Sequence, residues 1–342
     1  MTERIGIAAA GNWIVDRVKI LDRLPGRGML GNILSMTQSP GGAPANVLAD
    51  LARMCSQLPL SGVGVTGDDD DGRYLHETFQ SLGVNVEQLI ALPDAPTSFT
   101  DVMTEEATGV RSFFHHRGAN AMFGPEHVNI DKLDCRIFHL GYLLLLDRMD
   151  AADEETGTVA ARLLRDVRAA GIKTSVDVVS EDSDRFRTIV PPALKHVDYL
   201  MLNEVEAGRI VGIDVRDSNE KLDAGALREA VAKLAELGSM EWIFVHMPEG
   251  AYIKCNDGRT YSCGSQDVPD GFIVSSVGAG DACCAGMLFG VHQNWDIEQA
   301  ARFSMCCATA ALSAGGASDG LRPIEALLDL EHEFEFSAPP VG

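Results

Sequence analysis

Short apolar runs alternate with longer amphipathic stretches along much of the chain. The apolar runs are continuous, which is typical of strands buried on both faces of a parallel sheet. They lie at residues 5–10, 137–140, 199–202 and 242–246, and two further strands are predicted at 61–66, where the residues are small, and at 174–178. Helical spacing of apolar residues predicts helices at residues 40–54, 68–82, 154–170, 185–195, 204–211, 226–237, 281–289, 296–314 and 323–331. Repeated strand–helix units of this length predict an α/β fold with a mostly parallel sheet covered on both faces.

Two other regions have the alternating pattern or the turns of short antiparallel strands. Residues 98–104 and 110–116 flank a turn at Gly109 and alternate apolar with polar side chains, which predicts a half-buried hairpin. Residues 18–38 contain several glycines and a proline and predict two further strands joined by a turn. Together these segments predict a small sheet that stands apart from the main body. A last hairpin is predicted to turn at residues 256–258.

The composition narrows the class of protein. The chain has 342 residues, of which 46% are hydrophobic, so it can bury a large core. Its formal charge of −22 argues against nucleic acid or an anionic membrane as a partner. No apolar run approaches the ~20 residues of a membrane span. The N-terminus leads directly into a strand-like run without a signal peptide, so we expect a cytoplasmic protein.

The cysteines and an aspartate cluster are interpreted as structural features. The eight cysteines include two adjacent pairs, at residues 283–284 and 306–307, and no C-x-x-C spacing. Both pairs lie in alanine-rich helical stretches, so we expect reduced, buried thiols and no metal site built from them. Four aspartates at residues 68–71 are interpreted as a solvated helix start, where negative charge is favoured.

A glycine-rich turn is the strongest candidate for chemistry. Gly278, Ala279 and Gly280 separate an extended segment from a helix, and Asp281 follows at once. Glycines let consecutive N–H groups point at one spot, and a helix N-terminus favours an anion there. A carboxylate beside such an anion site fits removal of a proton from a hydroxyl while the amides stabilise a transferring phosphoryl group. The plain alternative is that Asp281 only caps the helix.

Two further groups carry candidate ligand-binding residues. Asp16 follows the first strand, and Gly41 and Gly42 lead into a helix whose first turn contains Asn46, a pattern suited to a polyhydroxyl ligand.

Asn203 and Glu206 lie three apart at the carboxyl end of a strand, so they share a helix face that can orient a hydrated Mg²⁺. The alternative for this pair is a capping box without a ligand.

In order and spacing, these motifs resemble the ribokinase-like (PfkB) carbohydrate kinase family over about residues 4–330. The resemblance is carried by Gly-Gly-Ala-Pro-Ala-Asn at 41–46, Gly-Val-Thr-Gly-Asp-Asp at 64–69, Asn-x-x-Glu at 203–206 and Gly-Ala-Gly-Asp at 278–281. It implies a three-layer α/β/α domain made from residues 1–16, 41–96 and 119–332. It further implies a small β lid, residues 17–40 and 97–118, that closes over the sugar and sometimes pairs into a homodimer. Residues 333–342 are expected to form a C-terminal tail.

The resemblance also implies a role for each candidate residue. Asp281 would be the general base, and Gly278, Ala279 and Gly280 would supply the anion hole. The sugar hydroxyls would be held by Asp16, Gly41, Gly42 and Asn46. ATP would bind with Mg²⁺, which Asn203 and Glu206 would order through water.

Three departures from the family pattern affect the nucleotide side. Ser275-Ser276 stand where the family usually has Asp-Thr, which leaves activation by a monovalent cation open. Residues 246–250 replace a Thr-x-Gly, which makes His246 and Gly250 the candidate phosphate contacts. Only small residues occupy positions 306–311, where relatives often have an asparagine beside the adenine.

The predicted function is therefore ATP- and Mg²⁺-dependent phosphorylation of a hydroxyl of a small sugar. Three alternatives remain open. A nucleoside kinase of the same fold could stack a base on Phe99 or Phe113. A sugar phosphate could be the substrate, with Arg117 as its cation. Residues 246–250 also leave room for a non-catalytic, sugar-binding relative.

Overall fold

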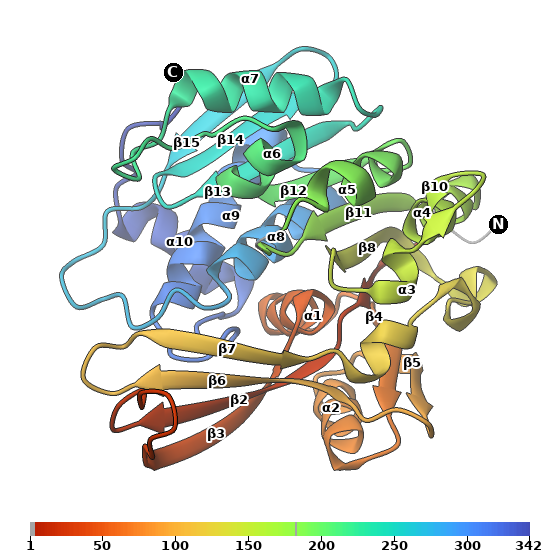
Figure 1. Cartoon of the computed structure of the whole chain (residues 1–342). Coiled ribbons are helices and arrows are strands. Elements are labelled where there is room, and N and C mark those ends of the chain that lie inside the picture. The colour runs from red at the N-terminus through yellow and green to blue at the C-terminus, as the bar shows by residue number, and fades with distance from the viewer. Residues whose placement is uncertain (1–3, 182) are drawn as a thin grey trace.

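The computed structural model describes residues 4–181 and 183–342 and contains a large sheet, its covering helices and a separate small sheet (Figure 1). The large sheet has nine strands in the order β15-β14-β13-β12-β11-β8-β1-β4-β5. Its strands are β1 (Gly6–Gly11), β4 (Leu60–Gly67), β5 (Asn85–Leu92), β8 (Cys135–Leu143), β11 (Lys173–Val178), β12 (Tyr199–Asn203), β13 (Trp242–Met247), β14 (Gly250–Cys255) and β15 (Thr260–Gly264). At one edge, β14 pairs antiparallel with both β13 and β15, and all other neighbours are parallel.

Helices cover both faces of this sheet, as the sequence predicts. One apolar core lies under α1 (Ala43–Met54), α2 (Asp70–Ser81), α8 (Ala279–His292), α9 (Ile297–Leu312) and α10 (Ile324–Glu333). A second core lies under α3 (Asp147–Asp150), α4 (Val159–Ala169), α5 (Phe186–Leu194), α6 (Glu204–Val211) and α7 (Ala224–Ala235). Because the inner strands are buried on both faces, their sequences read as continuous apolar runs; every residue of β1 is buried.

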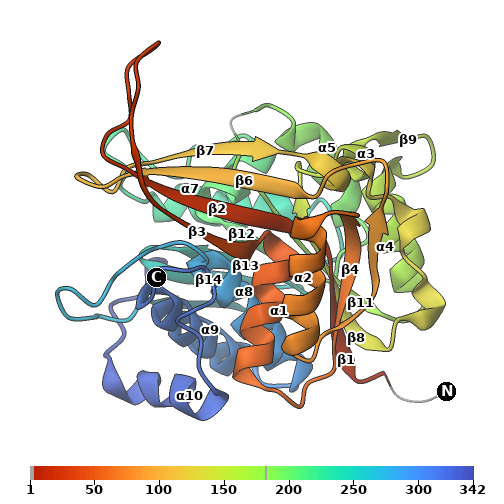
Figure 2. The same cartoon turned by 90° about the horizontal axis from the view of Figure 1, so that it is seen from below.

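The small sheet has four strands in the order β3-β2-β6-β7 and stands away from the main sheet (Figure 2). Its strands are β2 (Ile14–Leu21), β3 (Ile33–Gly41), β6 (Ser98–Glu105) and β7 (Arg111–His116). Strands β2 and β6 pair parallel, and the outer pairs are antiparallel. Because β2 begins three residues after β1 ends, Asp16 lies in the small sheet beside the carboxyl end of β1.

One predicted helix needs correction, and one strand was missed. The helix predicted at 154–170 begins only at Val159, because the residues before it form the short pair β9 (Ala152–Asp153) and β10 (Gly157–Thr158). The Thr158 side chain then caps α4 by accepting from the Ala161 N–H at 3.2 Å. The edge strand β5 was not predicted, because its exposed and buried residues mix without a clear period.

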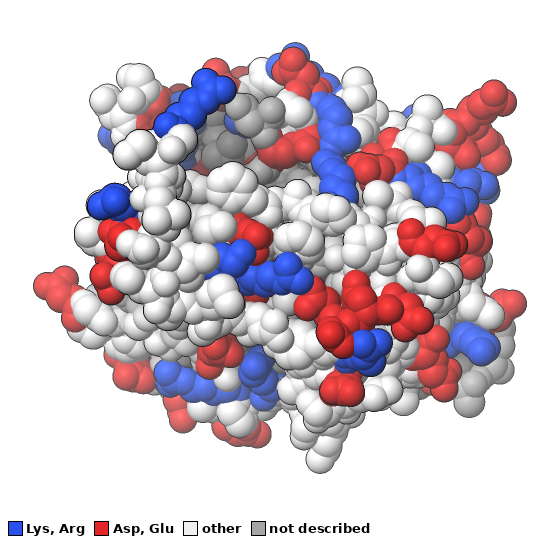
Figure 3. All heavy atoms as spheres, turned by 60° about the horizontal axis from the view of Figure 1, so that its bottom comes forward, with Lys and Arg blue, Asp and Glu red and all other residues white. Residues whose placement is uncertain are grey.

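The helix predicted at 281–289 is longer and packs closely on α9. A Cβ at Gly286 would lie 2.8 Å from Cys307 Sγ, so the glycine lets the two helices approach. The small side chains of these helices, cysteines included, suit this close packing, and all eight cysteines are free. Among the described residues, no helix has the length and apolar character to span a membrane. Acidic side chains are spread over the face seen in Figure 3, in keeping with the negative charge of the chain.

Candidate active site

The glycine-rich turn adopts a geometry that only glycine allows at its first position. Gly278 has φ of 79° and precedes α8, and a Cβ there would lie 2.1 Å from the Ala317 carbonyl oxygen. No side chain caps the helix N-terminus, so Asp281 is not a cap. The capping alternative for Asp281 is thereby excluded, and no side chain occupies the amides at the start of α8, of which Ala279 N–H donates to the Ser276 carbonyl oxygen at 3.4 Å.

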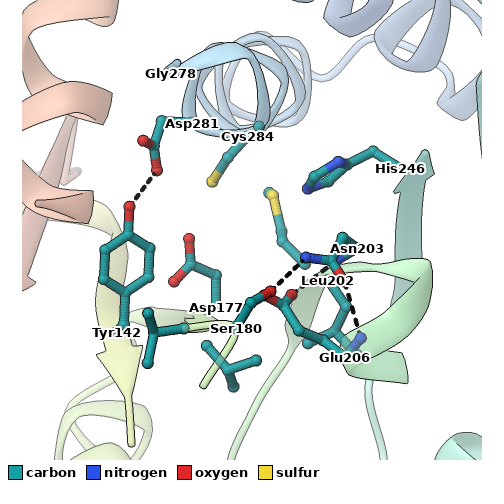
Figure 4. A pocket seen from close by; sticks show the side chains of 14 residues that line it. Tyr142, Asp177, Ser180, Leu202, Asn203, Glu206, His246, Gly278, Asp281 and Cys284 are labelled. Atoms are coloured by element: carbon teal, nitrogen blue, oxygen red, sulfur yellow. Dashed lines mark hydrogen bonds between the residues drawn. The ribbon is translucent and has the colours of Figure 1, made fainter. Parts of the chain in front are cut away.

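Two side chains from distant parts of the sequence hold the Asp281 carboxylate. Asn46, in the first turn of α1, donates its Nδ2–H to Asp281 Oδ2 at 2.8 Å. Tyr142, near the end of β8, donates its hydroxyl to Asp281 Oδ1 at 2.9 Å (Figure 4). Each carboxylate oxygen keeps a second lone pair for a substrate hydroxyl.

The pKa values of the Asp281 and Asp16 carboxyl groups are both raised, chiefly by burial. Burial raises the pKa of Asp281, whereas the hydrogen bonds from Asn46 and Tyr142 lower it. The pKa of Asp16 rises to about 6, mainly because of burial; a hydrogen bond with Thr100 opposes this and the charge of Asp281 adds to it. Asp16 is not among the residues that line the cavities described below, but two interacting acids with raised pKa values are typical of a functional site.

The double glycine gives α1 its close approach to Asp16. A Cβ at Gly41 would lie 2.1 Å from Asp16 Oδ2, and Gly42 has φ of 89° with its Cβ position 2.0 Å from the Asn12 carbonyl oxygen. A larger residue at Gly42 would require the backbone to move, and one at Gly41 would displace the Asp16 carboxylate. The predicted residues Asp16, Gly41, Gly42 and Asn46 therefore lie together beside Asp281.

Two neighbouring cavities meet at the start of α8. The smaller, of about 200 Å³, is lined by Tyr142, Asp177, Val178, Val179, Ser180, Met201, Leu202, Asn203, Glu206, His246, Gly278, Gly280, Asp281 and Cys284. The larger, of about 710 Å³, shares Ser180, Asn203, His246 and Gly280 with it and is otherwise lined mostly by apolar side chains of α6, β13, α8 and α9. A small polar chamber joined to a larger apolar one suits a phosphate chain joined to a heterocyclic base.

Asn203 and Glu206 form a capping box, in which Asn203 lines both cavities and Glu206 lines the smaller one. Asn203 Oδ1 accepts from the Glu206 N–H at 2.8 Å, and Glu206 Oε2 accepts from the Asn203 N–H at 2.9 Å. Ser180 donates its hydroxyl to Glu206 Oε1 at 2.7 Å. Burial raises the pKa of Glu206 to about 7 against these hydrogen bonds. The two residues can therefore cap α6 and also line the cavity. The lone pairs left on the Glu206 carboxylate suit a metal-bound water.

The other two predicted phosphate contacts, His246 and Gly250, offer no positive charge to a nucleotide. His246 lies against Gly280, whose Cβ position is 3.0 Å from His246 Cε1, and burial lowers the pKa of His246 to about 4. It is therefore a neutral imidazole near pH 7. Gly250 pairs with Met247 and Gly264 in the edge hairpin and is not among the residues that line the two cavities.

Two arginines of the small sheet region are already engaged. Arg117 pairs with Asp147 at 2.7 Å and is not among the residues that line the two cavities. Arg111 donates to the Ser275 hydroxyl at 3.1 Å, at the position where the resemblance predicts an aspartate. A cation of the small sheet thus contacts a residue three positions before Gly278.

Sequence reasoning missed several residues of the smaller cavity, among them Tyr142, Asp177 and Cys284. Asp177 left a signal, because it is a lone carboxylate inside the strand predicted at 174–178. Tyr142 lies two residues after the predicted strand 137–140. This is the carboxyl end of a parallel strand, where α/β sheets bind ligands.

Comparison with known proteins agrees with this geometry. The family model "pfkB family carbohydrate kinase" matches residues 5–324. A 5-dehydro-2-deoxygluconokinase of Shouchella clausii is 25% identical over 308 residues, covering 87% of this chain and 89% of its own. An ATP-dependent ribose-1-phosphate kinase of Halopiger xanaduensis is 27% identical over 314 residues, covering 91% and 92%.

Solved structures share the fold. Arabidopsis thaliana ribokinase, complexed with ribose and ATP, superposes with a TM-score of 0.79 at 22% identity, covering 95% of this chain and 98% of that one. A nucleoside kinase of Methanocaldococcus jannaschii gives 0.75 at 16% identity, covering 97% and 99%. The chain therefore has the ribokinase-like fold and belongs to the pfkB family of carbohydrate kinases, enzymes that use ATP to phosphorylate sugar-like substrates.

Proposed function

We propose that the enzyme transfers the γ-phosphoryl group of ATP to a hydroxyl of a small, unphosphorylated sugar or sugar acid. The observation that carries this proposal is the position of Asp281. Its carboxylate lines the smaller cavity beside the bare amides of Gly278 and Gly280, and Asn46 and Tyr142 hold both of its oxygens. Proton acceptor and anion site are therefore within reach of one reacting group.

In this mechanism, each residue acts on a stated atom. Asp16, Asn46 and the backbone at Gly41 and Gly42 hold sugar hydroxyls next to Asp281. Asp281 accepts the proton of the attacking sugar hydroxyl. The oxygen of that hydroxyl bonds to the γ-phosphorus, and the bond between the γ-phosphorus and ADP breaks. The amides of residues 278–280 stabilise the charge on the transferring group, so that positioning and electrostatics supply most of the catalysis.

Mg²⁺ would be held through its waters by Asn203 and Glu206. Bonds to each other and to Ser180 fix the positions of these two residues. When bound, the ion would neutralise charge on the ATP phosphates. None of the steps above requires Asn203 or Glu206 to coordinate Mg²⁺ directly.

The contacts of two aromatic side chains weigh on the nucleoside alternative. Phe99 stacks on His116 at 5.2 Å, and the Arg17 guanidinium covers it at 4.2 Å, so its ring is occupied. Phe113 is 63% exposed and pairs with Val102, on the sheet face that also carries Asp16. A nucleoside would therefore have to stack on Phe113.

A substrate panel tests the proposal. Release of ADP is measured with fructose, ribose, keto-deoxy sugar acids, ribose 1-phosphate and adenosine. We expect the highest kcat/KM with an unphosphorylated sugar or sugar acid. A preference for ribose 1-phosphate that falls in Arg117→Ala would overturn the unphosphorylated substrate, and a preference for adenosine that falls in Phe113→Ala would favour the nucleoside kinase. Sugar binding without ATP binding in calorimetry would favour the non-catalytic alternative.

Tyr142→Phe is expected to lower turnover about tenfold, the effect of losing one hydrogen bond to a charged group. The Tyr142 hydroxyl lowers the pKa of Asp281, so its removal raises that pKa and moves the acidic limb of the kcat–pH profile to higher pH. Tyr252→Phe, a buried tyrosine of β14 outside both cavities, serves as the control. An unshifted pH profile in Tyr142→Phe would show that the tyrosine does not position Asp281.

Asp16→Asn is expected to weaken sugar binding and yet stabilise the protein above pH 6. The pKa of Asp16 is about 6 when folded against an ordinary 3.8, so the folded state binds the proton more tightly. The ionised carboxylate therefore costs stability above pH 6, and this cost vanishes below pH 3.8. Removing it should add about 1–3 kcal/mol to the free energy of unfolding at pH 8 and almost nothing at pH 3.5. Urea titrations at both pH values measure this, with the exposed Asp94→Asn as control.

We also infer a homodimer that forms through the small sheet. Ile33, Leu34 and Met36 on the edge strand β3 are 51%, 51% and 66% exposed, and Phe113 and Phe114 on the opposite edge strand β7 are 63% and 58% exposed. Unpaired edge strands with exposed apolar side chains favour pairing with another chain. Sedimentation velocity should give twice the chain mass, and Leu34→Lys should shift it toward the monomer; a wild-type monomer at micromolar concentration would overturn the inference.

A further inference from the structure

Three metal-binding side chains that the proposed mechanism does not use lie together, and two of them, Asp177 and Cys284, line the smaller cavity. They are His139 of β8, Asp177 of β11 and Cys284 of α8. All three are buried, and their ligand atoms lie within 4.8 Å of one another. Cys284 Sγ lies 3.9 Å from His139 Nε2. Because the three residues come from separate elements, the fold itself assembles this cluster.

Asp177 supplies the observation that points to a ligand. The residue is only 9% exposed, and its Oδ1 has no hydrogen-bond partner in the described part of the chain. In Figure 4 its carboxylate projects into the cavity toward Cys284 and Asp281. Burying a carboxylate without a partner is costly, and a cation beside it would remove much of that cost.

Gly141 keeps space open beside this carboxylate. A Cβ at Gly141 would lie 2.8 Å from Asp177 Oδ1 and 3.3 Å from His139 Nε2. Asp177 Oδ1 and His139 Nε2 therefore face the same space, which is free of side chains and which an alanine at position 141 would fill.

We propose that His139, Asp177 and Cys284 bind a thiophilic divalent cation of the Zn²⁺ class, with its open coordination position toward the cavity. Thiolate, imidazole and carboxylate together are a donor set for zinc, whereas Mg²⁺ prefers oxygen alone. A tetrahedral zinc separates its sulfur and nitrogen ligands by about 3.6 Å, close to the 3.9 Å between Cys284 and His139. On binding, the Cys284 S–H bond breaks, its proton goes to solvent, and the thiolate sulfur bonds to the metal.

Occupancy of this site inhibits phosphoryl transfer. Asp177 and Cys284 line the same cavity as Asp281 and the amides of Gly278 and Gly280, and that cavity measures only about 200 Å³. A divalent ion there takes space from the incoming phosphoryl group and weakens Asp281 as a proton acceptor. Inhibition rests on the proposed function, whereas binding of the metal does not.

The binding test uses Co²⁺ as a spectroscopic substitute for Zn²⁺ on the full chain. The wild type should bind one Co²⁺ per chain with a thiolate-to-cobalt charge-transfer band, which zinc abolishes. Cys284→Ala should lose the band, and Asp177→Asn should bind at least tenfold more weakly. Cys307→Ala, which removes an equally buried thiol from α9, should match the wild type. A wild type without the band, or an unchanged band in Cys284→Ala, would overturn the proposal.

Asp177→Asn decides the question if Cys284→Ala does not fold, because asparagine keeps the shape of the side chain. Unchanged affinity for Co²⁺ in that variant would also overturn the site. For inhibition, Zn²⁺ is titrated at fixed Mg²⁺ and ATP, and a chelator should restore activity. Cys284→Ala should need at least tenfold more Zn²⁺ for half-inhibition than Cys307→Ala. Equal sensitivity in the two variants would refute inhibition through this site, while the cobalt spectrum still reports on binding if the protein shows no kinase activity.

Discussion

Asp281→Asn is expected to fold and to bind sugar and ATP, but to lose about 10²–10⁴ in turnover, the usual scale of general-base catalysis. Asparagine has the shape of the aspartate and cannot accept the proton of the attacking hydroxyl. Its amide also presents N–H groups to one of the two donors, Asn46 or Tyr142, that hold the carboxylate. Steady-state kcat is the measurement, with calorimetric sugar affinity and Tm on the same sample.

The comparison of these three readouts separates chemistry from structure. Because Asp281 has a raised pKa caused first by burial, its neutral replacement should not lower Tm. A large loss of kcat with preserved sugar affinity and Tm assigns the aspartate to the chemical step. Near-normal turnover would remove Asp281 from the mechanism, and loss of folding would make it a structural residue.

Gly278→Ala is expected to lower turnover about 10²–10³-fold, the effect of losing an oxyanion-type donor. The alanine Cβ would meet the Ala317 carbonyl oxygen at 2.1 Å, and the residue also has φ of 79°. The turn must then move, which displaces the amides that face the transferring group. The measurement is kcat with saturating sugar and ATP.

Gly271→Ala is the matched control for this substitution. Gly271 also has a positive φ, 81°, but its Cβ would meet nothing within 4 Å. Both variants therefore carry the backbone strain of a left-handed alanine, and only Gly278→Ala carries the clash at the anion site. Equal losses in the two variants would trace the effect to backbone strain in general and would argue against an anion hole at Gly278.

The elements of the large sheet could be predicted because burial on both faces leaves a strong local signal. Helix α6 was predicted with its observed bounds, since Asn203 caps its start and Gly212, with φ of 73°, ends it. The start of α4 was wrong because apolar periodicity does not reveal a two-residue strand pair that interrupts it. Edge strand β5 lacks the continuous apolar run that marks the inner strands.

The site was predictable only where a local motif marked its residues. Asn46 and Asp281 contact each other across 235 residues of sequence, and each was found because a glycine-rich turn precedes it. Tyr142 contacts Asp281 across 139 residues without any such motif. The cluster of His139, Asp177 and Cys284 depends on three elements packing together, which no single stretch of sequence records.

The most direct test of the central claim is a crystal structure with the preferred sugar and a non-transferable ATP analogue bound. The measured quantity is the distance from the Asp281 carboxylate to the hydroxyl that becomes phosphorylated. We expect a hydrogen bond of about 2.6–3.2 Å, with that hydroxyl facing the γ-phosphorus. A sugar whose reacting hydroxyl bonds to Asp177 or to water, with Asp281 still held only by Asn46 and Tyr142, would contradict the assignment of Asp281 as the base.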